Sequence, residues 1–430
     1  MTGKLYQKLI DMKVRMGIEH LFMGWNGILG LMISYSLYVN LPYCMPGCRL
    51  CRKSHTISSG LMEEYPAAVI QEMRECRQRA GKEVPVQSVY VGGGCPTRLD
   101  ISHLTALLRS IKEIFELEPR VEVTLEAVPG TVPQRGFQRL QDHGVNRISL
   151  EWFGIYDRDL GFLGRPYRYR DFVHTVTGIR QAGIENLNLD LMFGIPGQEM
   201  SQWRRVVGAA LSMEPEHLSA YSFHPEEDSL MNSWMAKGLI ASPDPGKRAA
   251  MYTYLDERLQ QKGYDHYELS SWARPGYVCQ HNLRYWRSDP YLGFGAGAHG
   301  YVDGRRTQTV SSPSRYIQAV EEDGCEGAFP GTSASLPLPD QPREAHMLDF
   351  VFMGLHLIQE GVSRGRFYER FQIRLDQFLV NAIQPLVEKG LLQWTDESLK
   401  FTARGVEVAP RVLHRLVEES KNGSLPQGEI

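Results

Sequence analysis

Three cysteines, Cys44, Cys48 and Cys51, stand in a C-x3-C-x2-C spacing that brings three thiolates around one point. A structural zinc or an ordinary cubane iron–sulfur cluster takes four protein ligands. Three cysteines on a [4Fe–4S] cluster leave one iron open to bind another molecule. The spacing therefore predicts a cluster with an open iron, and a structural zinc completed by a distant ligand is the alternative.

A glycine run adds a second element to this chemistry. An open iron is what radical S-adenosylmethionine (SAM) reactions require, because SAM chelates it, takes an electron and splits to a 5′-deoxyadenosyl radical. The run Gly92–Thr97 directly follows an expected strand, exposes backbone amides and allows a ligand to approach closely. We expect it to hold the amino and carboxylate groups of SAM. Taken alone, the same run is equally typical of a tight turn.

Charged residues follow or interrupt other expected strands. Glu126 ends one strand, and Asp190 interrupts an apolar one. A carboxylate inside a strand is costly unless it is paired or used, so we favour a role in a site for Asp190. We also favour a site role for Glu126, with a solvated side chain as the alternative. Arg165, Arg168 and Arg170 follow the fourth strand, where one of them would meet a carboxylate of SAM or of a tetrapyrrole.

A second dense cluster is His281–Trp286, followed by the glycine-rich run Gly293–His299. A histidine beside aromatic side chains would suit the ligation of a haem iron. The alternative is an aromatic-packed loop that closes the fold, and the residues alone favour this alternative. Cys95 and Cys279 are either spare iron ligands or small buried cysteines.

The pattern of elements shows how these residues would come together. Short β-rich runs alternate with amphipathic helical stretches, which predicts parallel βαβ units. The candidate residues fall at the carboxyl ends of successive strands, which form one mouth of a barrel. We therefore predict an α/β fold with a partial (β/α)6 barrel. The six expected strands are Leu37–Leu41, Ser88–Val91, Val121–Glu126, Arg147–Leu150, Leu187–Met192 and His217–Phe223.

Composition changes along the chain predict a second, smaller domain. After a stretch rich in Gly, Pro and Ser, the sequence has amphipathic helices at Glu344–Glu360 and Ile373–Lys389, then a small hairpin and a closing helix. This order resembles a winged-helix module. The expected division is an N-terminal extension (1–35), the barrel (36–322), a linker (323–343), the winged-helix-like domain (344–420) and a tail (421–430).

Overall composition narrows the class of protein. The chain has 430 residues and a formal net charge of −3, so nothing suggests nucleic acid as its main partner. Seven cysteines, of which three are clustered, do not form a disulfide framework and fit a reducing cytoplasm. The apolar run Leu21–Ile33 is too short to cross a bilayer, so we expect no stable membrane span.

With these residues in view, the sequence resembles the coproporphyrinogen-III-dehydrogenase-like radical SAM family, in particular its haem-chaperone (HemW-type) branch. The likeness covers about residues 36–420 and includes the C-terminal module. The runs that carry it are Leu37–Cys44, Gly92–Thr97, Asn146–Leu150, Leu163–Arg165, Asn188–Gln198, Gly263–Ser270 and His281–His299.

The resemblance implies a [4Fe–4S] cluster on the three cysteines and SAM beside it. In the chaperone branch, the run that matches His281–Trp286 is associated with haem binding, so the resemblance implies a haem contact at His281. The implied SAM contacts are Tyr38, Gly93, Glu126, Arg165 and Asp190, with Gly94 and Cys95 near a second SAM position that the dehydrogenases use.

The sequence also departs from the family's pattern. Leu50 replaces an aromatic residue, Cys95 a threonine, Val128 an asparagine and Tyr167 a frequent histidine. The usual Gly-Val-Gln-Ser after the fourth strand is here Glu151–Gly154, so a glutamine expected near SAM is missing. These departures concern contacts to the adenine and ribose of SAM and leave the cluster ligands intact.

Two functions follow from the resemblance. The first is a haem chaperone that binds the cluster, SAM and haem, takes electrons from a reducing donor and delivers haem to an acceptor apo-protein. The alternative is a radical SAM enzyme acting on a tetrapyrrole, by oxidative decarboxylation of coproporphyrinogen III, methyl transfer or haem ring opening. The dehydrogenases usually carry a further cysteine soon after the triplet, where this chain has Arg52–Ser54, which favours the chaperone.

Two further interpretations remain. The altered residues near SAM are also compatible with a scaffold that carries a cluster and catalyses nothing. Residues 1–31 show no family resemblance, and we predict that translation of the native protein starts at Met32.

Overall fold

A computed structural model describes residues 34–50, 57, 59–227, 229–322 and 328–421. Cys51, the predicted start at Met32 and the expected tail after residue 421 lie outside the described residues.

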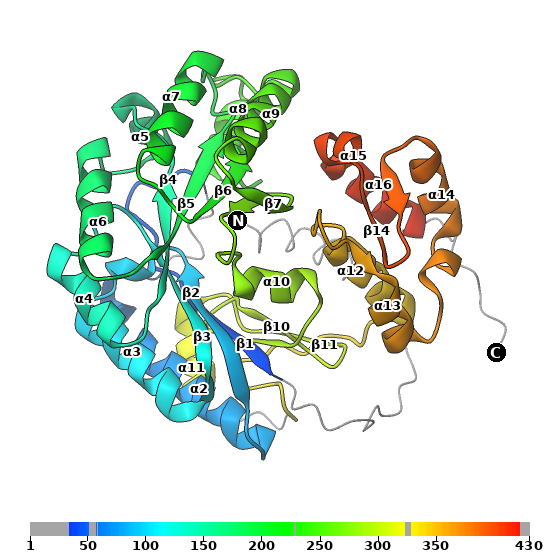
Figure 1. The fold of residues 1–430 in the computed structure, drawn as a ribbon. Coiled ribbons are helices and arrows are strands. Elements are labelled where there is room, and N and C mark those ends of the chain that lie inside the picture. Colours follow the sequence, from blue (N-terminus) through cyan, green and yellow to red (C-terminus); the bar gives the residue numbers. More distant parts are fainter. Residues whose placement is uncertain (1–33, 51–56, 58, 228, 323–327, 422–430) are drawn as a thin grey trace.

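The centre of the fold is a sheet of 11 strands in the order β11-β10-β9-β1-β2-β3-β4-β5-β6-β8-β7 (Figure 1). Strands β1 to β6 lie side by side in chain order, and every neighbouring pair among them is parallel. All six predicted strands are present, and the partial barrel is confirmed. Their bounds are Tyr35–Leu41 (β1), Pro85–Gly93 (β2), Glu116–Ala127 (β3), Arg147–Trp152 (β4), Asn186–Phe193 (β5) and His217–Ser222 (β6).

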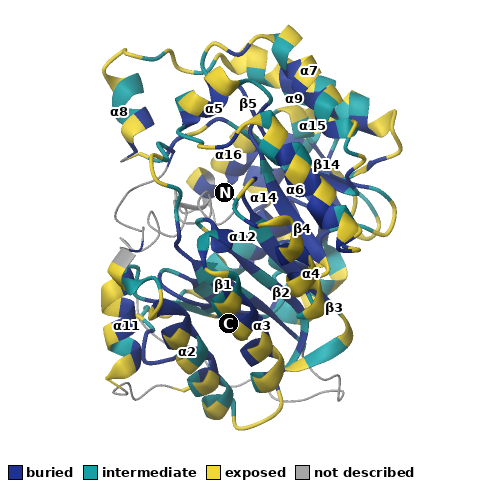
Figure 2. Ribbon diagram, turned by 90° about the vertical axis from the view of Figure 1, so that its left-hand side faces the viewer, coloured by how far each residue is buried: buried dark blue, intermediate teal, exposed yellow. Residues whose placement is uncertain are grey.

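Helices connect these strands and cover the outer face of the sheet, with their exposed sides turned to solvent (Figure 2). Apolar residues at helical spacing drive this packing, as in α3, where Leu104, Leu107 and Ile111 are buried. The carboxylate of Asp100 caps the start of α3 by accepting from Ser102 N. These helices are α2 (Tyr65–Ala80), α3 (Ile101–Ile114), α4 (Gln134–Asp142), α6 (Tyr169–Gln181), α7 (Met200–Leu211) and α9 (Pro245–Gln260). The short helices α5 (Asp157–Leu163) and α8 (Leu230–Ala236) instead pack beside residues 47–50.

The inner face of the sheet is polar. Along β1, Leu37 and Val39 join the apolar core, and the alternate residues Ser36, Tyr38 and Asn40 point to the other face. Closed barrels usually fill their interior with branched apolar side chains. A polar interior contributes less to stability and fits a surface that serves a site.

Short strands extend the sheet beyond the predicted six. Strand β9 pairs in parallel with β1, and β8 pairs antiparallel with β6. Strands β7 to β11 have only three or four residues each and are not among the predicted strands. The remaining elements here are β7 (Asp265–Glu268), β8 (Ser271–Ala273), α10 (Gln280–Trp286), β9 (Tyr291–Phe294), β10 (His299–Val302), β11 (Arg305–Gln308) and α11 (Pro313–Glu321).

The C-terminal domain is a group of helices with a three-stranded sheet in the order β12-β14-β13. The domain lies beside α10 in Figure 1. The expected hairpin is confirmed as β13 and β14. The single helix expected at Ile373–Lys389 is wrong, because Leu379 adopts a left-handed φ of 53° between two short helices. The elements are α12 (Arg343–Gly354), β12 (Val362–Ser363), α13 (Arg364–Phe371), η4 (Leu375–Gln377), α14 (Val380–Glu388), β13 (Leu392–Trp394), β14 (Ser398–Phe401), α15 (Ala403–Glu407) and α16 (Ala409–Lys421).

Part of the expected linker packs firmly on the barrel. The Thr332 hydroxyl donates to the fully buried carboxylate of Glu72 on α2, at 2.9 Å. The same carboxylate accepts from Gly295 N at 2.9 Å and from the Tyr316 hydroxyl at 2.6 Å. Burial raises the pKa of Glu72 to about 7. Glu72 thus ties the segment after β9 and part of the expected linker to α2.

No helix among the described residues is long and apolar enough to cross a membrane.

Candidate functional site

The cysteine loop begins where β1 ends. Cys44 and Cys48 are both half-buried, and neither forms a disulfide. The glycine run after β2 packs directly against this loop, since Gly94 N donates to Leu41 O at 3.0 Å. A Cβ on Gly94 would lie 2.9 Å from Cys44 N and 3.0 Å from its Sγ. Only glycine leaves room here, so the run serves the thiol-bearing loop and is more than a turn of the barrel.

A second segment packs on the other side of the cysteine loop. The end of α5 approaches so closely that a Cβ on Gly164 would lie 1.9 Å from Gly47 O. Arg49 adds a hydrogen bond from its guanidinium to Phe162 O at 3.1 Å. These contacts bring the residue after Gly164, which is Arg165, to the same mouth of the barrel.

Glu126 lies at the end of β3 with its carboxylate held from two sides. It accepts from the Tyr90 hydroxyl at 2.9 Å and from Gly93 N at 3.0 Å. A Cβ on Gly92 would lie 2.9 Å from the Glu126 carboxyl carbon, so this glycine makes the position possible. Burial is the main reason that the pKa of Glu126 is raised. The carboxylate is pre-positioned for a cation or a hydroxyl donor.

Asp190 stands on the inner face of β5 and is held in the same manner. Its two oxygens accept from the Ser149 hydroxyl at 2.7 Å and from the Asn188 amide at 2.9 Å. Burial raises its pKa, and its charge in turn raises the pKa of Glu126. Two carboxylates whose ionised forms are disfavoured by burial and by each other would both gain from a bound cation.

Arg165 is the one arginine of the predicted three that is buried at this mouth. Its guanidinium forms an ion pair of 2.8 Å with Glu151, and the two side chains are only 9% and 13% exposed. It also lies over the Phe153 ring, 4.9 Å from the centroid. Arg168 and Arg170 have side chains that are 64% and 73% exposed, so they are solvated.

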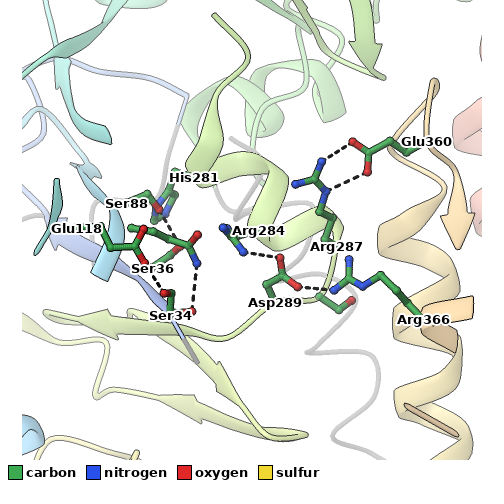
Figure 3. Close-up of polar contacts among 12 residues, drawn as sticks. Ser34, Ser36, Ser88, Glu118, His281, Arg284, Arg287, Asp289, Glu360 and Arg366 are labelled. Atoms are coloured by element: carbon green, nitrogen blue, oxygen red, sulfur yellow. Dashed lines mark hydrogen bonds and ion pairs between the residues drawn. The ribbon is translucent and has the colours of Figure 1, made fainter. Parts of the chain in front are cut away.

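His281 lies on α10, on the inner face of the sheet, 1% exposed (Figure 3). Nδ1 is 3.0 Å from the Ser88 hydroxyl, and Nε2 is 2.8 Å from the Tyr285 hydroxyl. Burial lowers its pKa to about 3, so the imidazole is neutral. The ring also packs against Tyr90, with centroids 5.1 Å apart. Since both ring nitrogens have partners, ligation of an iron would require one of these bonds to break, and the haem contact at His281 stays a prediction.

Helix α10 is fixed at both ends. The Glu122 carboxylate on β3 accepts from the backbone N–H groups of Gln280 and His281, each at 3.0 Å. Beyond its other end, Asp289 pairs with Arg284 at 3.0 Å and also with Arg366 of α13 (Figure 3). The helix therefore connects the inner face of the barrel with the C-terminal domain.

Comparisons with known proteins agree with this geometry. The model of the Radical SAM superfamily matches residues 40–210, and that of the HemN C-terminal domain matches residues 341–408. The protein named heme chaperone HemW in Bacillus subtilis is 32% identical over 372 residues, which cover 86% of this chain and 96% of the relative. The protein of the same name in Synechocystis is 34% identical over 333 residues, 74% of this chain and 77% of the relative.

This chain belongs to the HemW family of radical SAM proteins. Among solved structures, coproporphyrinogen III oxidase (HemN) from Escherichia coli superposes with a TM-score of 0.74 at 19% identity, covering 89% of this chain and 90% of that one. At this identity the likeness shows the fold alone. Membership of the radical SAM superfamily implies a [4Fe–4S] cluster and SAM.

Cys95 differs from the other implied SAM residues of this HemW-family chain. Its thiol is 1% exposed and lies 3.6 Å from the Thr97 hydroxyl, within an apolar cluster that also contains Leu50, Val128 and Phe153. Burial raises the pKa of the thiol to about 11. Its side chain therefore faces protein atoms, and any role near a second SAM would come from its backbone.

Sequence reasoning missed several residues that hold the site. Tyr90, Glu122, Ser149 and Asn188 each hydrogen-bond a predicted site residue or its helix. A signal for them exists, because polar residues alternate along these strands, as in Glu122-x-Thr124-x-Glu126. The pattern marks the inner face but does not say which partner each side chain meets.

Proposed function

We propose that this HemW-family protein is a haem chaperone that binds a [4Fe–4S] cluster, SAM and haem and delivers haem to an acceptor apo-protein. The observation that carries the cofactor part is the packing of the glycine run on the cysteine loop, beside the held carboxylate of Glu126. The names of the relatives from Bacillus subtilis and Synechocystis support the haem part.

The residues present fit both cofactors. Cys44 and Cys48, together with Cys51, would hold the cluster, and Gly94 leaves space beside the Cys44 sulfur. Gly93, Glu126 and Asp190, with Tyr38 stacked over Tyr90 at 6.1 Å, would surround SAM. When bound, the cluster and SAM supply one-electron chemistry. The protein's own part is to hold two carboxylates near a cationic ligand and to keep the cysteine loop in place.

Haem binding by this protein is tested by titrating haem into anaerobically reconstituted protein and following the haem absorption spectrum. We expect saturable binding with a cluster spectrum that does not change. If His281 is the iron ligand, Nε2 must exchange the Tyr285 hydroxyl for iron. Tyr285→Phe should then tighten haem binding, and His281→Ala should weaken it. Absence of haem binding by the parent protein would refute the chaperone proposal.

The alternative is a radical SAM enzyme acting on a tetrapyrrole such as coproporphyrinogen III. The observation that keeps this alternative is the set of donors that holds Glu126 and Asp190, because SAM bound there would serve catalysis as well as a carrier. Incubating reduced, reconstituted protein with SAM and coproporphyrinogen III separates the two functions. Stoichiometric release of 5′-deoxyadenosine with consumption of the porphyrinogen would favour the enzyme, and haem transfer to an apo-cytochrome without it favours the chaperone.

We also propose a compartment and partners for the protein. An oxygen-sensitive cluster fits a reducing cytoplasm, where a reducing electron donor is at hand, and the five cysteines that the structure describes form no disulfide. A near-neutral chain gives no reason to include nucleic acid among the partners.

A further inference from the structure

The pairing of Glu151 with Arg165 determines what the mouth of the barrel offers to a ligand. Arg165 is the buried cation that sequence reasoning expected to meet a carboxylate of SAM. Its guanidinium is already 2.8 Å from the Glu151 carboxylate, and both side chains are largely shielded from water. A charge-assisted pair of this kind is strong because solvent does not compete with it.

The neighbours of this pair keep it in place. The Phe153 ring lies under the guanidinium at 4.9 Å, and buried Tyr167 is close enough to feel the charges of both partners. The Tyr167 hydroxyl stays neutral because burial, and then the negative charge of Glu151, raise its pKa. Glu151 is the register partner of Asp190 across β4 and β5. The pair is thus built into the sheet and is not a chance contact of flexible side chains.

Acidic and basic groups both lie near this mouth. The carboxylates are those of Glu126, Glu151 and Asp190. Arg165 pairs with Glu151. Burial raises the pKa of Asp190, and the charge of buried Arg147 opposes this rise. SAM carries a sulfonium, an ammonium and a carboxylate. Glu126 and Asp190 offer partners to its two cationic groups, whereas the Arg165 guanidinium that would meet its carboxylate is already paired with Glu151.

We propose that Glu151 takes the place of a ligand carboxylate on Arg165, so that the site recognises the cationic adenosylsulfonium part of SAM and gains nothing from its carboxylate through Arg165. This inference rests on the proposed binding of SAM at the mouth. Glu151 is then a specificity-determining residue, and it lies within the run that departs from the family's usual Gly-Val-Gln-Ser.

The test compares SAM with its decarboxylated analogue, S-adenosylmethioninamine, by calorimetric titration of the anaerobically reconstituted protein. The measured quantity is the ratio of the two dissociation constants in the parent and in Glu151→Ala. Any contribution of the cluster iron to carboxylate binding is common to both proteins and cancels in this comparison. We expect Glu151→Ala to shift the ratio about tenfold or more towards SAM, since a charge-assisted hydrogen bond becomes available to its carboxylate.

Two further variants make the test specific, one at Glu151 and one at another acidic residue. Glu151→Gln keeps the size of the side chain and removes its charge, so it should shift the ratio in the same direction by a smaller factor, even if the alanine variant folds poorly. Asp157→Asn removes an acidic group that pairs with exposed Arg168 at 3.8 Å and should leave the ratio unchanged.

An unchanged ratio in both Glu151 variants, or a shift against SAM, would overturn the inference while leaving SAM binding itself established. An equal shift of the ratio in Asp157→Asn would show that removing another negative charge has the same effect, and it would also overturn the inference. Failure of the parent and of all variants to bind either ligand would instead overturn the proposed binding of SAM, and this inference with it.

Discussion

On the β1–β3 side of the barrel mouth, glycines and hydrogen bonds hold the cysteine loop and Glu126 open towards a ligand, whereas on the β4 side Glu151 closes onto Arg165. The first side keeps the cluster cysteines, Gly93 and Glu126 that the family resemblance implies, although Leu50, Cys95 and Val128 depart from the family's pattern there. The second side contains the run Glu151–Gly154, which replaces the family's usual Gly-Val-Gln-Ser. The comparison indicates that the part of the site that holds the cluster and the part that meets a carboxylate of the ligand can change independently, because they are built from different strands.

The strongest test of the β1–β3 side is removal of a cluster ligand. Cys44→Ala, Cys48→Ala or Cys51→Ala should each abolish reconstitution of the [4Fe–4S] cluster, because two thiolates do not hold the cube. Visible absorbance and electron paramagnetic resonance of reconstituted protein measure this. Cys76→Ala is the control, since Cys76 is buried on α2 in the apolar core. A full cluster signal in Cys48→Ala would contradict the assignment.

A smaller change on the same side is Gly94→Ala. The added Cβ would meet backbone nitrogens of Tyr43 and Cys44 at 2.9 Å, so the cysteine loop must shift. We expect several-fold lower cluster incorporation and little loss of folding. Gly161→Ala on α5 is the matched control, because its Cβ would have no atom within 4 Å. Equal incorporation in both variants would show that the glycine run does not position the loop.

The buried carboxylate beneath this side gives a dependence of stability on pH. The pKa of Glu72 is about 7 in the folded protein and 4.5 in an unperturbed chain, so folding favours the protonated form. Its contribution is fully present below pH 4.5 and is lost as pH rises through 7, by roughly 3 kcal/mol. Denaturant unfolding of the parent and of Glu72→Gln across this range measures the difference, and identical pH profiles would contradict the expectation.

The smallest expected effect concerns the hydrogen bond that holds Glu126. Tyr90→Phe keeps the ring and removes the donor, which should weaken SAM binding by about 1 kcal/mol, or roughly fivefold. Tyr156→Phe is the control, because the Tyr156 hydroxyl has no hydrogen-bond partner among the described residues. Calorimetric titration with SAM measures both, and an unchanged affinity in Tyr90→Phe would show that the Tyr90 hydroxyl does not position Glu126 for SAM.

The sequence alone determined the parts of this protein that depend on local spacing. The cysteine triplet follows from three residues in one loop, and the six parallel strands follow from apolar runs between amphipathic helices. The placement of Glu126 and Asp190 at one mouth follows as well, since parallel strands end at the same edge of a sheet.

Only the tertiary structure decided which side chains meet. Glu122 caps α10 although 159 residues separate it from His281, and Glu151 reaches Arg165 because the end of α5 packs on the cysteine loop. The engagement of both nitrogens of His281 is likewise invisible in its motif, since Ser88 comes from a distant strand. Such pairings depend on strand register and loop packing, which bring together residues that no sequence period relates.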